Sequence, residues 1–226
     1  MTAPPSPLAV PRRRPRPPRN APSGAALLAL TAALAVVAPG AAQELAHDRS
    51  AEWLVATAVL AAPEEHRGGA EVRARDAAGE LVVLQEGTNH LICLADEPGD
   101  GFRAACYHES LEPFMARGRE LQAEGVTGNE RQERRWAEAE AGELVMPAQA
   151  AMVYNLGFPE EDIDPATADP ATGGRLHAVY MPGATPESTG LPTQPGPEPW
   201  LMFPGTPSAH VMIAIPPRSG EGGGGA

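Results

Sequence analysis

The sequence contains no lysine, only two cysteines and few aromatic side chains. All 17 basic residues are therefore arginines, and codon usage that favours arginine and alanine is enough to explain this. The main uncharged apolar run, residues 25–38, is shorter than the roughly 18 residues that a membrane-spanning helix requires. We therefore expect no stable membrane span once the N-terminus has been processed.

Complete catalytic and metal-binding motifs are also missing. The sequence has no GxSxG nucleophile elbow, no Walker A phosphate loop and no CxxC pair. The acidic stretch from Phe158 to Gly174 does not match the EF-hand pattern, so a solvated loop is favoured over a calcium site. These absences leave the cofactor unknown and predict no metal centre.

The N-terminus has the order of features that is typical of a secretory signal peptide. Five arginines come first, the apolar run follows, and Ala38–Ala42 supplies small residues for cleavage before Gln43. We predict a signal peptide at 1–42, a single globular domain at 43–217 and a disordered glycine-rich tail at 218–226. The protein is then periplasmic or secreted; the alternatives are an uncleaved N-terminal anchor and a wrongly assigned start codon.

The charge of the processed chain argues against one class of partner. Twelve arginines remain against 29 acidic residues, which is a formal charge of −17 with neutral histidines. The phosphate backbone repels such a chain, so we expect no binding to nucleic acid. Whether the partner is a small molecule or a protein stays open.

The two cysteines, Cys93 and Cys106, lie in the processed part of the chain. An even number of cysteines in an exported protein favours a disulfide bond. Closing this short loop stabilises the fold by about 3 kcal/mol in the loop-entropy account. Two buried free thiols, or two thiolates on a metal, are the alternatives.

Three helices are indicated by caps and by apolar spacing. The first begins after Ser50 and ends near Ala61, before a proline that stops it. A second begins near Ser110, as its cap, and ends at Gly125. Thr127 and Glu130 predict a capping box for a third helix over about 129–143, with Trp136 as one of its few apolar residues. The third helix is therefore largely exposed or rests on a partner.

Strands are indicated by alternation and by apolar runs between turns. Three of them form an antiparallel meander, and the others follow the helices. The predicted strands are 70–75, 81–84, 90–94, 150–156, 176–181 and 210–215. Residues 183–217 hold nine prolines and read as a long loop with a short apolar segment at 200–203. We predict an α+β fold, with an antiparallel sheet of about five to six strands and helices packed on one face.

A few residues are weak candidates for chemistry. His108 and Glu109, with Glu112, form an HExxE string that lacks the second histidine of zinc proteases, and carboxylates in a first helical turn need no metal to explain them. His177 and His210 lie in predicted strands, where they would suit acid–base or metal chemistry only if they converge with His90. A single strand histidine is more often half-buried and hydrogen-bonded.

The apolar segment in the proline-rich stretch is the weak candidate for ligand binding. Trp200, Met202 and Phe203 would line a pocket beside the sheet. The alternative is that these side chains belong to the core and that the prolines only stiffen a loop.

Four strings resemble an uncharacterised family of exported bacterial proteins with no established activity. They are Glu86–Asn89, Cys93–Asp96, Cys106–Glu109 and Pro204–Met212. The resemblance spans most of the processed chain and implies a bacterial, exported, single-domain protein. It carries no ligand, reaction or site residue with it.

These observations favour an exported, non-catalytic binding or envelope-associated domain of unknown ligand. The alternative is a metal-assisted enzyme of the hydrolase type that uses His108, Glu109, His177 and His210. A third hypothesis is a partner-binding protein that buries Trp136 and the helix carrying it.

Overall fold

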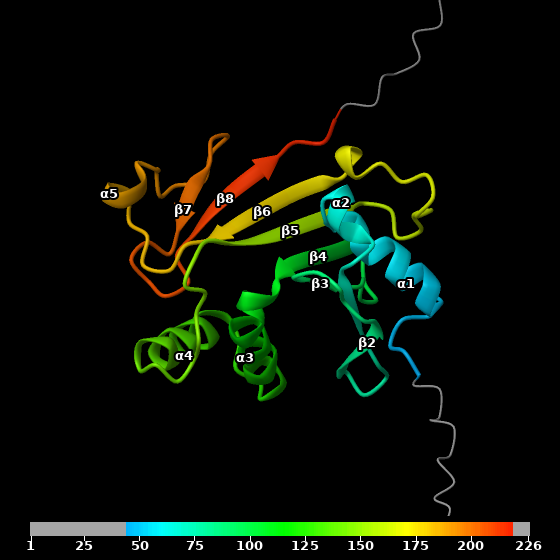
Figure 1. The fold of residues 1–226 in the computed structure, drawn as a ribbon, viewed down its shortest axis with the longest axis horizontal. Coiled ribbons are helices and arrows are strands. Elements are labelled where there is room, and N and C mark those ends of the chain that lie inside the picture. The colour runs from blue at the N-terminus through cyan, green and yellow to red at the C-terminus, as the bar shows by residue number, and fades with distance from the viewer. Residues whose placement is uncertain (1–43, 219–226) are drawn as a thin grey trace, which may run out of the picture. The chain divides into compact units, whose positions relative to one another are not determined.

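The computed structural model describes residues 44–218, which form one eight-stranded sheet with helices on both faces (Figure 1). The α+β class is therefore confirmed. The predicted signal peptide at 1–42 and residues 219–226 of the predicted tail lie outside the described residues. The helices are α1 (Ala51–Ala58), α2 (Glu64–Arg67), α3 (Glu112–Ala123), α4 (Gly128–Glu140) and α5 (Pro186–Thr189). The strands are β1 (Glu71–Arg75), β2 (Leu81–Gln85), β3 (Leu91–Leu94), β4 (Phe102–His108), β5 (Ala151–Phe158), β6 (Gly174–Tyr180), β7 (Trp200–Met202) and β8 (His210–Ile215).

The sheet is mixed, so the prediction of an antiparallel meander is wrong. The strand order is β2-β1-β3-β4-β5-β6-β8-β7, and β3 pairs in parallel with β1 while the other neighbours are antiparallel. After the β1–β2 hairpin the chain passes the start of β1, where Thr88 and Asn89 donate backbone hydrogen bonds of 2.8 and 3.0 Å to the Gly69 carbonyl. Strand β2 lies between β1 and β3 in the sequence and reverses the direction of the chain. A short loop after β2 is therefore enough to place β3 parallel to β1.

The number of strands is also larger than the expected five to six. Strand β4 was missed although Phe102, Ala104 and Cys106 alternate with more polar neighbours and are all buried. Its period-two pattern was readable in the sequence. The segment at 200–203 contributes β7, a three-residue strand that pairs with the end of β8.

Helices cover both faces of the sheet, which corrects the prediction that they lie on one face. Side chains alternate along a strand, so Cys93 and Cys106 lie on one face while Ile92 and Tyr107 lie on the other. The apolar helix α1 packs on the first face, here called the α1 face, in a cluster with both cysteines. Leu111, which leads into α3, packs on the second face, here called the α3 face.

The predicted start of α1 and end of α3 are confirmed, whereas the predicted caps of α3 and α4 are wrong. Ser50 Oγ accepts a hydrogen bond of 3.2 Å from the Trp53 amide, and α3 is followed by Gly125 at φ 83°. Ser110 is not a cap, because a 3-10 turn over 109–111 precedes α3 and there the His108 ring accepts from the Ser110 amide. The Thr127 side chain makes no cap hydrogen bond at α4.

Helix α4 packs on α3 through Arg135, which is only 8% exposed to solvent. The guanidinium lies 4.0 Å from the centre of the Phe114 ring and donates to Gln132 Oε1 over 2.6 Å. A Cβ at Gly118 would lie 2.7 Å from Arg135 Nη1, which explains a glycine inside α3. Helix α4 also contacts its own chain through Trp136, whose Nε1 donates to Ser208 Oγ over 2.7 Å. The Trp136 contact, for which the third hypothesis names a partner, is therefore made within the chain.

Candidate functional site

The predicted disulfide is confirmed. Cys93 on β3 and Cys106 on β4 lie directly opposite each other with Cα atoms 4.0 Å apart, and both are fully buried. They sit under α1 in the core of the α1 face, next to Ala58. The bond thus ties two central strands together from inside the protein. Within residues 44–218, no helix is long and apolar enough to cross a membrane.

The candidate histidines do not converge on one place. The His177 ring lies edge-on to Tyr154 on the α1 face, with ring centres 5.3 Å apart. His210 is buried on the α3 face, where it stacks on Tyr180 at 4.7 Å. His90 stacks on His108, with ring centres 5.7 Å apart.

The HExxE string is also divided between the two faces of the sheet. His90 Nδ1 lies 2.7 Å from Glu109 Oε1 at the end of β4. Glu112 instead lies on the α3 face, where it accepts from Arg73, Arg119 and the Tyr107 hydroxyl over 2.6, 2.7 and 2.5 Å. Among the described residues no group of three or more His, Cys, Asp or Glu side chains could hold a metal ion.

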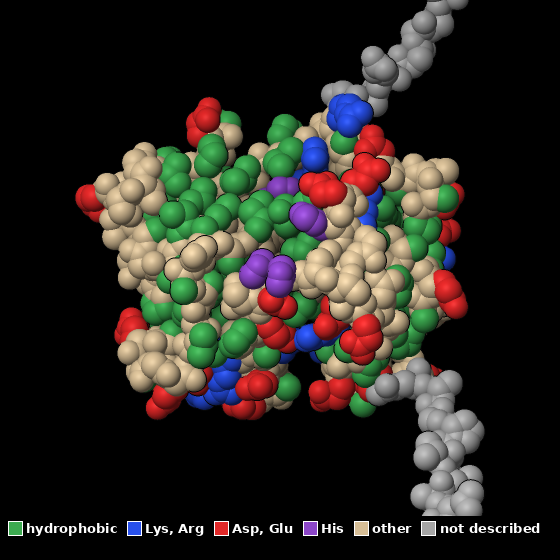
Figure 2. All heavy atoms as spheres, in the orientation of Figure 1, with side chains coloured by type: hydrophobic (Ala, Val, Ile, Leu, Met, Phe, Trp, Pro, Cys, Tyr) green, Lys and Arg blue, Asp and Glu red, His purple; other side chains and the backbone are tan. Residues whose placement is uncertain are grey.

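The Trp200 segment belongs mainly to the core beside α4. The Phe203 ring lies 5.3 Å from the Trp136 ring and 5.7 Å from the His210 ring. Leu201 of the same segment is fully buried, whereas Met202 is 39% exposed. Three further apolar side chains, Val179, Val211 and Ile213, are half-buried on the α1 face over β6 and β8, where Figure 2 shows an apolar area next to histidines.

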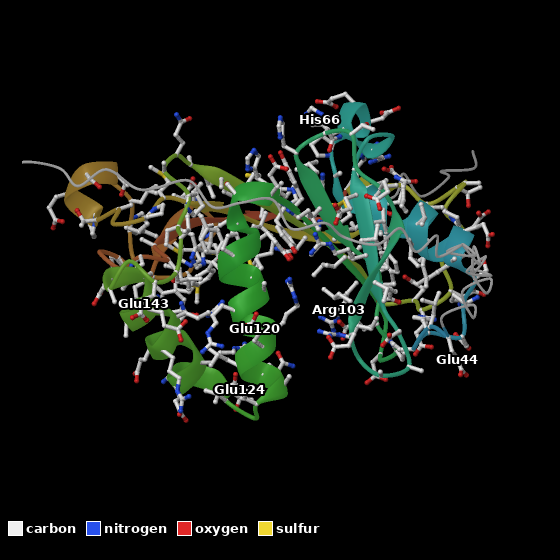
Figure 3. All side chains as sticks on the ribbon, turned by 60° about the horizontal axis from the view of Figure 1, so that its bottom comes forward. Glu44, His66, Arg103, Glu120, Glu124 and Glu143 are labelled. Atoms are coloured by element: carbon white, nitrogen blue, oxygen red, sulfur yellow. A yellow bond between two sulfur atoms is a disulfide. The ribbon has the colours of Figure 1, made fainter. Side chains whose placement is uncertain are left out.

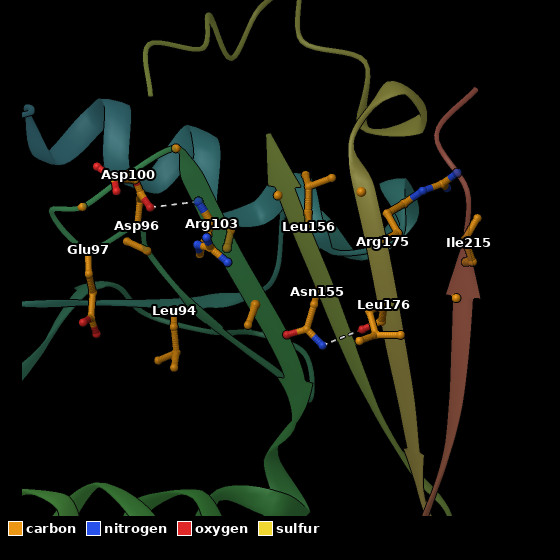
Figure 4. A pocket seen from close by; sticks show the side chains of 18 of the residues that line it. Leu94, Asp96, Glu97, Asp100, Arg103, Asn155, Leu156, Arg175, Leu176 and Ile215 are labelled. Atoms are coloured by element: carbon orange, nitrogen blue, oxygen red, sulfur yellow. Dashed lines mark hydrogen bonds between the residues drawn. The ribbon is translucent and has the colours of Figure 1, made fainter. Parts of the chain in front are cut away.

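A groove of about 1350 Å³ opens elsewhere, on the part of the α3 face that α3 leaves uncovered (Figures 3 and 4). We call it the sheet groove. Its floor is a mostly apolar row across the sheet, in which Leu94 and Ala105 face each other and Leu176 faces Ala214. Asn155 lies between these pairs and donates to the Leu176 carbonyl over 2.7 Å. Leu176 is 41% exposed, so the floor is open to a ligand.

A second row closes one end of the sheet groove. Arg103 on β4 faces Gly157 on β5, which in turn faces Gly174 on β6, and Arg175 follows directly. Arg103 lies at this end of the groove (Figure 4), whereas Arg175, the register partner of Leu156, points to the α1 face. A Cβ at Gly174 would have its nearest neighbour, the Gly157 carbonyl oxygen, at 3.8 Å, so the absent side chain leaves free space.

Arg103 and Arg175 differ from the other arginines in residues 44–218. Every other described arginine donates to a protein oxygen or pairs with a carboxylate. Within this part of the chain, only the side chains of Arg103 and Arg175 make neither contact, and of the two only Arg103 extends from the face that carries the sheet groove. The Arg175 Nε is moreover buried without a partner.

The carboxylates on the rim of the sheet groove are mostly engaged already. Glu97 accepts from Arg75 over 2.7 Å. Asp96 accepts from the Arg103 backbone amide over 2.9 Å and lies 3.5 Å from His47 Nε2. The rim therefore does not neutralise the Arg103 guanidinium.

Comparison with protein-family models, with curated proteins and with solved structures finds no significant match to this chain. The site must therefore be judged on its geometry. Sequence reasoning missed the sheet groove because its residues come from β3 to β8 and are adjacent only in the folded sheet. The alternation of Arg103 with buried neighbours was the one local signal that Arg103 faces away from the α1 core.

We expect the stability of the protein to fall as the pH drops below about 6.5, and His210 to contribute to this fall. Burial lowers the pKa of His210 and of His177, so both are more readily protonated in the unfolded chain. The unfolded state then binds more protons in this range, which favours unfolding as the pH decreases. Urea unfolding of wild type and of His210→Asn at several pH values measures this, and the variant should show a shallower dependence. The exposed His66→Asn is the control, and equal slopes for His210→Asn and wild type would contradict the prediction.

Proposed function

We propose that this chain is an exported, non-catalytic binding domain whose sheet groove holds an elongated, mostly apolar ligand. The observation that supports it is the open apolar row on the sheet floor beside α3. Ligand pockets are concave, mostly apolar and fitted with a few polar groups, and this groove has that composition. Its volume exceeds the roughly 300–1,000 Å³ of common small-molecule pockets, so a long ligand suits it better than a compact one.

The alternative of a metal-assisted hydrolase has weaker support. It needs His177 and His210 to cooperate, and these lie on opposite faces of the sheet. His108 and Glu109 lie beside His90, and Glu112 is engaged by arginines on the other face. The geometry therefore favours a binding function over a catalytic one.

Filling the groove floor tests the proposal. Gly174→Leu places a side chain over the row where the structure has space, and Gly68→Leu is a matched control outside the groove with no neighbour within 4 Å of a Cβ. Nile red, a neutral apolar dye, should bind the wild-type protein saturably and Gly68→Leu equally well. We expect Gly174→Leu to bind about tenfold more weakly or worse, which is about 1.4 kcal/mol or more.

Circular dichroism and thermal unfolding would establish that both variants fold. The proposal is wrong if the folded wild-type protein shows no saturable binding, or if the folded Gly174→Leu binds the dye as tightly as wild type.

A further inference from the structure

We infer that the outer edge of strand β2 docks an extended segment of another protein, which pairs with Leu81 and Val83 and carries a basic residue near each of its ends. Strand β2 is one of the two outer strands of the sheet and lies at the end away from β7 and β8 (Figure 1). This edge is separate from the sheet groove, whose lining residues begin at Leu94.

The backbone groups of Leu81 and Val83 point away from the sheet. Leu81 lies opposite Arg75 and Val83 opposite Arg73 in the antiparallel pair with β1. The carbonyls of Arg75 and Arg73 point to the other side of β1, where they accept backbone amides from the segment before α1 and from the residue after β3 over 2.9 and 2.8 Å. Because opposite residues of an antiparallel pair exchange hydrogen bonds only at every second position, Leu81 and Val83 direct their own N–H and C=O groups outward. No backbone group in the described part of the chain pairs with these four groups.

The opposite edge of the sheet is protected, whereas that of β2 is not. Strand β7 is only three residues long, its Leu201 amide donates to the Pro192 carbonyl over 2.8 Å, and Pro197 and Pro199 precede it. Short strands, prolines and covering loops are devices that keep an edge from pairing. Residues 80–86 contain no proline, lysine or arginine, and the register shift of the β1–β2 pair comes after the two outward-facing residues. An edge of this kind is a template for an added strand.

The side chains of β2 favour an apolar strand as the neighbour. Val83 is 46% exposed and lies on the α3 face, while Leu84 packs from a half-buried position against the core of the α1 face. Side chains on neighbouring strands of one face pack in pairs. An added strand with alternating apolar residues would therefore cover Val83, which the rest of the described chain leaves open to solvent.

The charges at the two ends of β2 favour another protein over a second copy of this chain. Glu80 and Glu86 flank the strand, and both are exposed and form no ion pair within residues 44–218. A second copy paired antiparallel here would bring a glutamate of each chain to both ends of the joined strands, and like charges that meet across neighbouring strands are destabilising. The formal charge of −12 adds to the repulsion between copies. Basic residues of a partner would instead meet a carboxylate at each end.

Two peptides of the same length test the inference, each labelled with fluorescein and measured by fluorescence anisotropy: RVTVTVR and EVTVTVE. Wild type should bind RVTVTVR saturably and at least about tenfold more tightly than EVTVTVE. A fully N-methylated RVTVTVR should not bind, because it has no amide hydrogen to donate to the edge.

Variants of the edge locate the binding. Val83→Pro removes an outward N–H and should weaken binding of RVTVTVR about tenfold or more, whereas Val83→Thr keeps this amide and should bind as wild type does. Glu80→Gln together with Glu86→Gln should reduce the preference for the basic peptide to within about twofold. Glu143→Gln, an exposed glutamate beyond the end of α4 (Figure 3), is the control for loss of charge.

Several outcomes would overturn the inference. Folded wild type that binds neither peptide, or that binds the N-methylated peptide as tightly as the unmodified one, rules out strand addition. Equal binding by wild type and by Val83→Pro, when circular dichroism shows both to be folded, places the peptide elsewhere. A wild-type dimer that Val83→Pro dissociates in analytical ultracentrifugation makes a second copy the occupant. If Val83→Pro does not fold, the comparison of the peptides on wild type decides.

Discussion

Replacing Cys93 and Cys106 together by alanine is expected to lower the free energy of unfolding by about 2–5 kcal/mol. The disulfide closes a loop of 13 residues in sequence separation, and its removal returns conformational freedom to the unfolded chain. Both side chains are fully buried under α1, so their loss also removes packing in the core. Urea unfolding of the double variant and of oxidised wild type measures the difference.

The reduced wild-type protein provides the control for this experiment. Reductant should lower the unfolding midpoint of wild type and leave that of the double variant unchanged. Mass spectrometry without reduction should find the wild-type chain two hydrogens lighter than after reduction, since one disulfide is formed. Two thiols that can be alkylated in protein purified without reductant would contradict the prediction.

Phe102→Ala is expected to cost about 3–5 kcal/mol, because it removes a large, fully buried ring and leaves a cavity. The centre of the Phe102 ring lies 6.1 Å from that of Trp53 of α1, which it meets edge-on, and 6.0 Å from that of Phe158. The ring therefore joins the helix to the sheet at the start of β4.

Phe158→Ala is the matched control for that change. Phe158 is the register partner of Phe102 on β5 but is only half-buried, so the same truncation should cost clearly less. Chemical unfolding of both variants gives the two free energies. Equal losses would show that burial on the α1 face does not decide the stability of this strand pair.

Both changes bear on the proposed binding site because the sheet groove lies on the reverse of the same strands. Leu94 and Ala105, which form its floor, directly follow Cys93 and precede Cys106 in the chain. Arg103 directly follows Phe102. The core on the α1 face therefore holds in place the backbone that presents these groups on the other face.

The candidate site shows where sequence reasoning stops. Trp200 and Phe203 belong to an apolar segment among prolines, which predicts a ligand pocket, but the Phe203 ring packs against Trp136 and His210. Arg103 and Arg175 did not stand out, because whether an arginine is paired depends on residues far along the chain. Arg73, for example, is held by Glu112, 39 residues away.

Neighbouring residues alone decided several features of this protein. Ser50 caps α1, Gly125 follows the end of α3, and the strand at 210–215 has the predicted bounds, since each depends on backbone preferences or alternation within a few residues. The pairing of Cys93 with Cys106 follows from there being no other cysteine. The tertiary structure decided the parallel neighbour of β1, the face that each helix covers, the separation of His177 from His210, and the sheet groove. These depend on which strands pair and how far a helix extends over them, and such contacts join residues that the linear sequence keeps apart.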